Sequence, residues 1–166
     1  MNYQLTKNDI AYQLIHFRPE GTAIPDNWYK HIKKKNGKTY YHALIILADI
    51  VRWYTPVTNE IDRDTGESKP PRKKYGADIL QIGYKHFENR YGLTEDQIRR
   101  ALRYLESSGF IKWEMRVIEL KENKKINAPY VRLFPQRVIE ISDPLHEEGV
   151  VGKIPPGWWE KSHHKY

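Results

Sequence analysis

Three arginines and a glutamine lie on the polar side and flanks of the segment between residues 95 and 108. Arginine can donate two hydrogen bonds to the acceptor edge of guanine, and glutamine can pair with the donor and acceptor edge of adenine. We therefore predict that Gln97 and Arg100 contact base edges of DNA. Contacts to phosphates, which position a protein without reading sequence, are expected from Thr94, Arg99 and Arg103.

Lysines elsewhere in the chain could add contacts to phosphates. Residues 121–127 form the polar tip of an expected hairpin, and two denser basic clusters occupy residues 30–38 and 69–74. A lysine that neutralises a phosphate releases a counterion and steepens the salt dependence of binding. The alternative is that the tip and the clusters are solvated, as most loops are. The lysines expected to contact DNA are Lys34, Lys35, Lys73, Lys74, Lys121, Lys124 and Lys125.

The segment 95–108 must be a helix for this chemistry to work. Its apolar residues recur at i, i+3, i+4 and i+7, which predicts one buried stripe that fixes the helix on the domain. Thr94 is a strong N-cap, and Gln97 three residues later completes a capping box. Alone, this helix could equally be a solvated amphipathic helix. The stripe consists of Ile98, Ala101, Leu102 and Leu105.

The neighbouring elements favour the functional interpretation. A short helix over 84–91 and a turn at Gly92 come before the arginine segment, and Gly109 after it suits a left-handed C-terminus. Alternating residues from Phe110 predict a half-buried strand, followed by a polar tip at 121–127 and a returning strand at 130–134. This order predicts an α+β fold of the winged helix-turn-helix type. Tyr84, at the start of the short helix, is counted with the expected DNA contacts.

The segment from Thr39 to Tyr54 predicts the longest helix, central and buried on most sides. Its β-branched content also permits a strand, but His42, Asp49 and Arg52 would share one polar side of a helix. The segment 55–74 predicts a loop or mobile hairpin. We expect one domain over residues 1–143, with a 55–74 insertion, and a C-terminal tail over 144–166. Shorter helical segments are expected at 6–17, from residue 24 and from residue 135.

The sequence resembles winged-helix proteins of bacterial, phage and plasmid origin. These are the DNA-binding domains of replication initiators of the phage O-protein type and related stand-alone helix-turn-helix proteins. The resemblance covers residues 24–141. It is strongest in Gly92-Leu93-Thr94, Arg100-Ala101-Leu102, Leu105-Glu106 and Gly109-Phe110-Ile111. It implies a winged-helix fold that binds double-stranded DNA, with residues 94–103 in the recognition helix.

Composition agrees with a polyanionic partner and excludes several other classes. The 166 residues contain 28 Lys+Arg and 21 Asp+Glu, a formal net charge of +7. Without cysteine there can be no disulfide, thiolate metal site or cysteine nucleophile. The seven histidines lack the spacing of metal ligands, and Asp49 and Asp78 are isolated. We expect no catalysis, metal or cofactor, no membrane segment or signal peptide, and a cytoplasmic location.

Two further expectations concern protein partners. Trp158 and Trp159 in the tail could anchor a protein interface, or the tail could fold back on its own domain. A homodimer is plausible because two-fold DNA sites favour paired readers. The second functional class is a protein-interaction adaptor built on the same fold.

Overall fold

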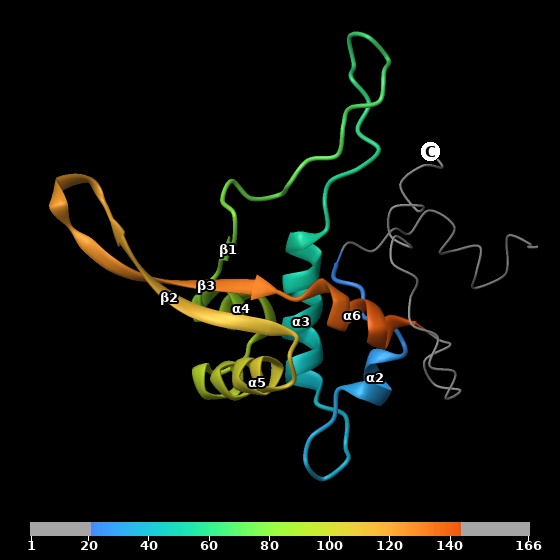
Figure 1. Ribbon diagram of the computed structural model, residues 1–166, viewed down its shortest axis with the longest axis vertical. Coiled ribbons are helices and arrows are strands. Elements are labelled where there is room, and N and C mark those ends of the chain that lie inside the picture. The colour runs from blue at the N-terminus through green and yellow to red at the C-terminus, as the bar shows by residue number, and fades with distance from the viewer. Residues whose placement is uncertain (1–20, 144–166) are drawn as a thin grey trace, which may run out of the picture.

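The computed structural model describes residues 21–143, and these form one mixed α and β unit (Figure 1). The elements in chain order are α2 (Trp28–His31), α3 (Tyr41–Tyr54), β1 (Leu80–Gln81), α4 (Tyr84–Tyr91), α5 (Glu95–Ser107), β2 (Ile111–Glu119), the 3-10 turn η1 (Lys121–Asn123), β3 (Lys125–Leu133) and α6 (Pro135–Ser142). The α+β class is confirmed. The expected helix at 6–17 and the tail with Trp158 and Trp159 lie outside the described residues.

Helix α3 is the centre of the fold, as predicted. Its apolar side chains recur at three- and four-residue steps, and Leu44, Leu47 and Ile50 among them are 0% exposed. The helix begins at Tyr41, two residues later than expected, and Pro56 follows its end. Asp49, which was expected on the polar side of the helix with His42 and Arg52, is nevertheless 0% exposed. Three polar side chains, described below, contact the Asp49 carboxylate.

Helices α4 and α5 are joined by the predicted turn. Gly92 closes α4 in the left-handed conformation with φ 65°, where an L side chain would be strained. The capping box of α5 is confirmed: Gln97 N donates to Thr94 Oγ1 at 3.3 Å, and Thr94 N donates to the Gln97 carboxamide oxygen at 2.9 Å. The start of α5 is therefore held by two reciprocal bonds.

The apolar stripe of α5 packs against α3 and α4, as expected. Ile98, Ala101 and Leu105 are 0% exposed. Two short helices close the other side of the core, where Trp28 Nε1 of α2 donates to Ser142 Oγ of α6 at 2.8 Å. These contacts leave the polar side of α5 as the side that faces away from the core.

The three antiparallel strands lie in the order β1-β3-β2. The β2–β3 pairing runs without a break from Ile111↔Leu133 to Glu119↔Lys125. The expected returning strand was too short, because β3 begins at Lys125 rather than Tyr130. Lys125 therefore belongs to a strand and not to the tip.

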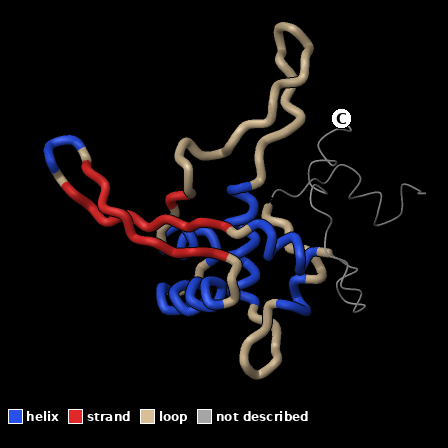
Figure 2. The backbone as a smooth tube through the Cα atoms, viewed as in Figure 1, coloured by secondary structure: helices blue, strands red, loops and turns tan. Residues whose placement is uncertain are grey.

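The expected half-buried alternation of β2 is wrong beyond Trp113. Met115 is 58% exposed and Val117 is 64% exposed, although both lie on the face that is buried at Ile111. The cause is the length of the hairpin, which extends past the helices into solvent (Figure 2). An alternating pattern predicts which face the apolar residues share, but it does not predict how far the covering helices reach.

The segment between α3 and β1 is a long projecting loop that doubles back like a hairpin (Figure 2). Isolated bridges join Val57 to Arg72 and Ile61 to Ser68. Arg72 also donates two hydrogen bonds to the Glu60 carboxylate, at 2.8 and 3.1 Å. The predicted loop or hairpin is thus present, with local pairing and no regular strand.

A buried carboxylate ties α3 to α4. Asp49 Oδ2 lies 2.5 Å from His86 Nε2, and Asp49 Oδ1 lies 3.5 Å from the Nε atoms of both Arg52 and Arg90. The carboxylate has no exposure, whereas its three partners reach solvent in part. A charge removed from water is tolerated only when such partners surround it.

Replacing Asp49 by Asn should therefore destabilise the fold, because it removes the carboxylate that joins Arg52, His86 and Arg90. We expect a loss of about 3 kcal/mol in the free energy of unfolding, the lower end for a broken buried pair, since the partners are partly solvated. Urea denaturation followed by circular dichroism measures it. Glu67→Gln in the exposed loop is the matched control. Equal stability of the two variants would show that the Asp49 cluster does not stabilise the fold.

Candidate nucleic-acid interface

The outward side of α5 carries arginines that are already paired with acidic residues one turn earlier. Arg100 Nε lies 2.9 Å from Asp96 Oδ2, and Arg99 pairs with Glu95. Arg103 is exposed. The helix contains three acidic and three basic residues, so it has no net charge of its own. It can offer directed donors, but it cannot supply a strong attraction to phosphates.

Gln97 is less free than the sequence suggested. Its carboxamide oxygen accepts the Thr94 N–H in the capping box. The expected bidentate contact with adenine needs both the oxygen and the amide nitrogen. A bidentate contact with adenine would therefore require the capping box to open. With the capping box closed, only the amide nitrogen of Gln97 could donate to a base. Arg100 is the better placed of the two residues expected to contact bases.

The basic loop before α3 lies against α5. We call residues 33–39 the lysine loop; a bridge between Lys33 and Thr39 closes it, and Lys34 N donates to Lys38 O at 2.8 Å. Lys33 N donates to the Tyr104 hydroxyl of α5 at 3.0 Å. The lysine loop, which includes the expected DNA contacts Lys34 and Lys35, is thus joined to α5 at Tyr104.

Two tyrosine rings form the joint between the lysine loop and α5. The rings of Tyr40 and Tyr104 meet edge to face at a centroid distance of 5.1 Å, and Lys34 Nζ lies 5.4 Å from the centre of the Tyr40 ring. Neither Tyr40 nor Tyr104 was among the residues predicted to contact DNA. No local pattern marks this pair, because its two members are far apart in the chain.

The electrostatics of Tyr40 place Arg100 in the same neighbourhood. Burial raises the pKa of Tyr40 above its ordinary value of 10.0, and the charge of Arg100 opposes this by lowering the pKa. The hydroxyl therefore stays neutral at physiological pH. The effects of Arg100, which lowers the pKa of Tyr40, and of Asp96, which raises it, indicate that the outward side of α5 lies close to this ring.

Tyr84 lies in a shallow groove between α5 and β2. Its ring is stacked on Trp113, with an interplanar angle of 2° and a centroid distance of 5.6 Å. The groove has a volume of about 300 Å³. A hydrogen bond with Tyr84, and then the charge of Glu95, raise the pKa of Arg99. The groove is lined by Tyr84, Arg99, Leu102, Arg103, Glu106 and Trp113.

The lysines of the β2–β3 hairpin are exposed at its far end. Lys121 and Lys124 flank the turn, while Lys125 Nζ lies 3.0 Å from Glu119 Oε1 across the strands. The turn itself contains left-handed residues at Glu122 and Asn123, with φ of 72° and 57°. These lysines extend from the body on a long arm and do not contact α5.

Lys73 and Lys74 lie apart from the arginine helix. Lys74 Nζ donates to Arg52 O at 2.6 Å, near the C-terminal end of α3, and Lys73 Nζ lies 5.8 Å from the centre of the Tyr75 ring. The lysine loop precedes the other end of α3, which is about 20 Å long. The structure therefore does not bring the two basic clusters together (Figure 1).

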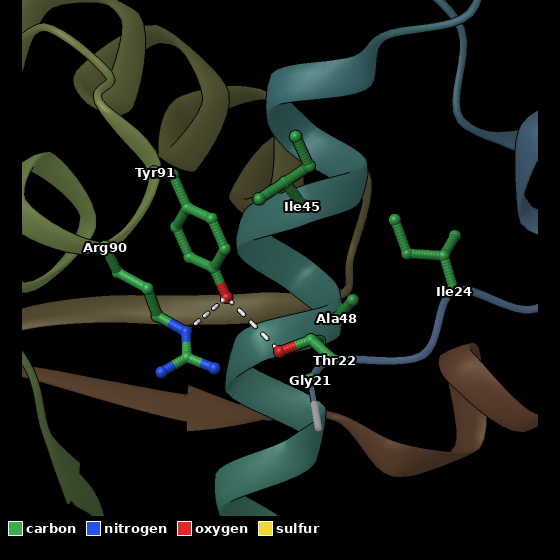
Figure 3. Close-up of a pocket in the computed structure, with 7 residues that line it drawn as sticks. All are labelled: Gly21, Thr22, Ile24, Ile45, Ala48, Arg90 and Tyr91. Carbon is green, nitrogen blue, oxygen red and sulfur yellow. Dashed lines mark hydrogen bonds between the residues drawn. The ribbon is translucent and has the colours of Figure 1, made fainter. Parts of the chain in front are cut away.

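A second hollow lies between α3, α4 and residues 21–24 (Figure 3). Its volume is about 560 Å³. On its polar side, Arg90 Nε donates to Tyr91 Oη at 3.0 Å, and that hydroxyl lies 3.3 Å from Thr22 Oγ1. Within residues 21–143 no group of three or more His, Cys, Asp or Glu could hold a metal ion. The helices of this part are too short or too polar to cross a membrane.

No protein-family model, curated protein or solved structure matches the chain. Function must therefore be inferred from the arrangement of its own residues.

The joint at Tyr104 can be tested without any ligand. Tyr104→Phe removes the hydroxyl that accepts the Lys33 N–H but retains the ring contact with Tyr40. We expect the Lys33 amide to exchange with solvent roughly fivefold faster, the effect of losing about 1 kcal/mol. Amide exchange followed by NMR gives the rate, and the Leu47 amide in α3 is the internal control. An unchanged rate at Lys33 would mean that the hydroxyl does not hold the loop.

Proposed function

We propose that residues 21–143 are a winged helix-turn-helix domain that binds double-stranded DNA without catalysis. In this proposal α4 and α5 are the helix-turn-helix, and the β2–β3 hairpin is the wing. The element order α3-β1-α4-α5-β2-β3 and the strand order β1-β3-β2 support it. So does the resemblance of residues 24–141 to winged-helix proteins of phage and plasmid origin.

The observation that carries the proposal is the lysine loop beside α5. Residues 33–39 contain four lysines and no acidic residue. They adjoin a helix that offers arginine donors but no net charge. Attraction to phosphates depends on unpaired positive charge, whereas base contacts depend on directed donors. The lysine loop supplies the positive charge, and α5 supplies the directed donors.

In the proposed complex α5 enters the major groove, and Arg100 donates to a guanine. Arg100 must first leave Asp96, which lies 2.9 Å away. This exchange favours the correct base, because an arginine that finds no acceptor in the groove retains its carboxylate. Lys34 and Lys35 contact phosphates on one flank, and Lys121 and Lys124 at the wing tip contact phosphates on the other.

The biological setting we propose is that of the proteins it resembles. It would be a cytoplasmic factor in replication initiation of a phage or plasmid, or a transcriptional regulator. The alternative is a protein-interaction adaptor on the same fold. The exposed apolar residues Met115 and Val117 favour that alternative, since neither has a role in contacting phosphates.

Salt titration of duplex binding tests the proposal. Each phosphate contact contributes about 0.9 to the slope of log K against log salt concentration. Lys34→Ala/Lys35→Ala should weaken binding to every duplex and reduce the slope by up to about 2. Lys73→Ala/Lys74→Ala is the matched control, because it removes the same charge at the other end of α3. Fluorescence anisotropy on random-sequence duplexes measures both.

Binding that is undetectable at low salt would overturn the proposal. Equal losses in the two double variants would place DNA elsewhere on the protein.

Arg100→Ala tests base recognition separately from phosphate contact. On a duplex selected from a random pool, we expect a loss of about 1 to 3 kcal/mol, the value of one good bidentate contact. The loss should be much smaller on unselected duplexes, where the arginine has no matched guanine. The ratio of the two affinities is the measured quantity. A variant that binds both duplexes equally less well would assign Arg100 to phosphates instead.

A further inference from the structure

The outer edge of β2 has no partner strand among residues 21–143. The sheet order β1-β3-β2 makes β2 an edge strand of nine residues, from Ile111 to Glu119. Much of this edge belongs to the hairpin that extends beyond the helices (Figure 1). Long edge strands with free backbone groups are templates for pairing with another chain.

The hydrogen bonds at the two ends of the hairpin show which backbone groups are free. Phe134 N donates to Phe110 O at 2.9 Å, and Leu120 N donates to Lys124 O at 2.7 Å. The register between these positions is unbroken, so the even-numbered residues of β2 face β3. The odd-numbered residues direct their N–H and C=O groups outward. They are Ile111, Trp113, Met115, Val117 and Glu119.

The side chains along this edge are unusual for a strand in water. Met115 and Val117, which follow Trp113 on one face, are more than half exposed. The charged residues Glu114 and Arg116 lie on the opposite face, where Arg116 also covers the Tyr130 ring at 4.8 Å. Protected edges usually carry charges on an exposed face or a bulge, and the exposed odd-numbered face of β2 has neither at its centre.

We propose that this edge pairs with a second copy of the chain, with the two β2 strands antiparallel about Met115. Met115 is the midpoint of β2. In this register Trp113 of each copy lies opposite Val117 of the other, so the apolar face continues across the pair. Glu114 of each copy lies opposite Arg116 of the other, which places opposite charges at the closer, non-hydrogen-bonded positions.

Other registers are disfavoured by charge and by face. Moving the centre by one residue places Glu114 opposite Glu114, or Arg116 opposite Arg116, and like charges directly opposite destabilise a strand pair. Moving it by half a residue places apolar residues opposite polar ones. The full-length register centred on Met115 therefore forms the backbone hydrogen bonds, continues the apolar face and places opposite charges opposite one another.

The pairing concerns only protein contacts and does not rest on the DNA proposal. One nine-residue strand pair buries less surface than the 1,200 Å² or more typical of stable interfaces. The dimer should therefore be weak and depend on concentration, with self-association at tens of micromolar.

Single cysteines test the register directly, because the chain contains no cysteine of its own. In Met115→Cys the two Cα atoms would lie about 5.5 Å apart across the hydrogen-bonded pair, which a disulfide can span. In the matched control Val117→Cys they would lie more than about 13 Å apart. Mild oxidation at about 50 µM should cross-link the first variant and leave the second monomeric. Equal cross-linking of both, or of neither, would overturn the proposal.

Charge reversal tests the same register by sedimentation. The wild-type mass should rise from 19.8 kDa toward twice that value as concentration increases. Glu114→Arg should weaken association at least tenfold, because it places arginines opposite one another. Glu114→Arg/Arg116→Glu should restore it, since the charges remain complementary. Circular dichroism confirms that both variants fold. A wild-type monomer at 100 µM, or a reversal that fails to restore association, would refute the pairing.

Discussion

The packing of α5 against α3 is the contact on which the proposed interface depends. Ile98 and Leu105 are 0% exposed, so the rotation of α5 about its own axis is fixed by the core. A helix with one buried stripe has one outward side. That side holds Arg100 and Arg103, and the adjoining flank holds Tyr104, which receives the lysine loop. The surface is therefore a consequence of how the core is filled.

Charge and donor geometry are divided between two elements. Helix α5 has no net charge, and its arginines are held by acidic residues one turn away. The lysine loop has an excess of positive charge and no fixed donor geometry comparable to a guanidinium. We infer that the loop provides attraction that does not depend on sequence, while the helix discriminates between sequences. Separating the two requirements allows affinity and specificity to change independently.

Local features of the fold could be predicted from the sequence, and long-range ones could not. The capping box at Thr94 and the bounds of α4 follow from residues within a few positions of one another. The burial of Asp49 depends on His86 and Arg90, which are distant in the chain. The length of β3 was underestimated because its first residues pair with β2 in solvent. A strand with no buried face needs no alternation of apolar and polar residues, so the sequence does not mark it. The contact of Tyr40 with Tyr104 has no sequence signal.

The location of the proposed DNA-binding surface is the central claim, and NMR titration of the labelled protein with a short duplex tests it most directly. We predict that the largest amide shifts fall in the lysine loop and on the outward side of α5, from Asp96 to Arg103. The hairpin loop between Val57 and Arg72 should not respond. Shifts confined to that loop, with α5 unchanged, would contradict the account.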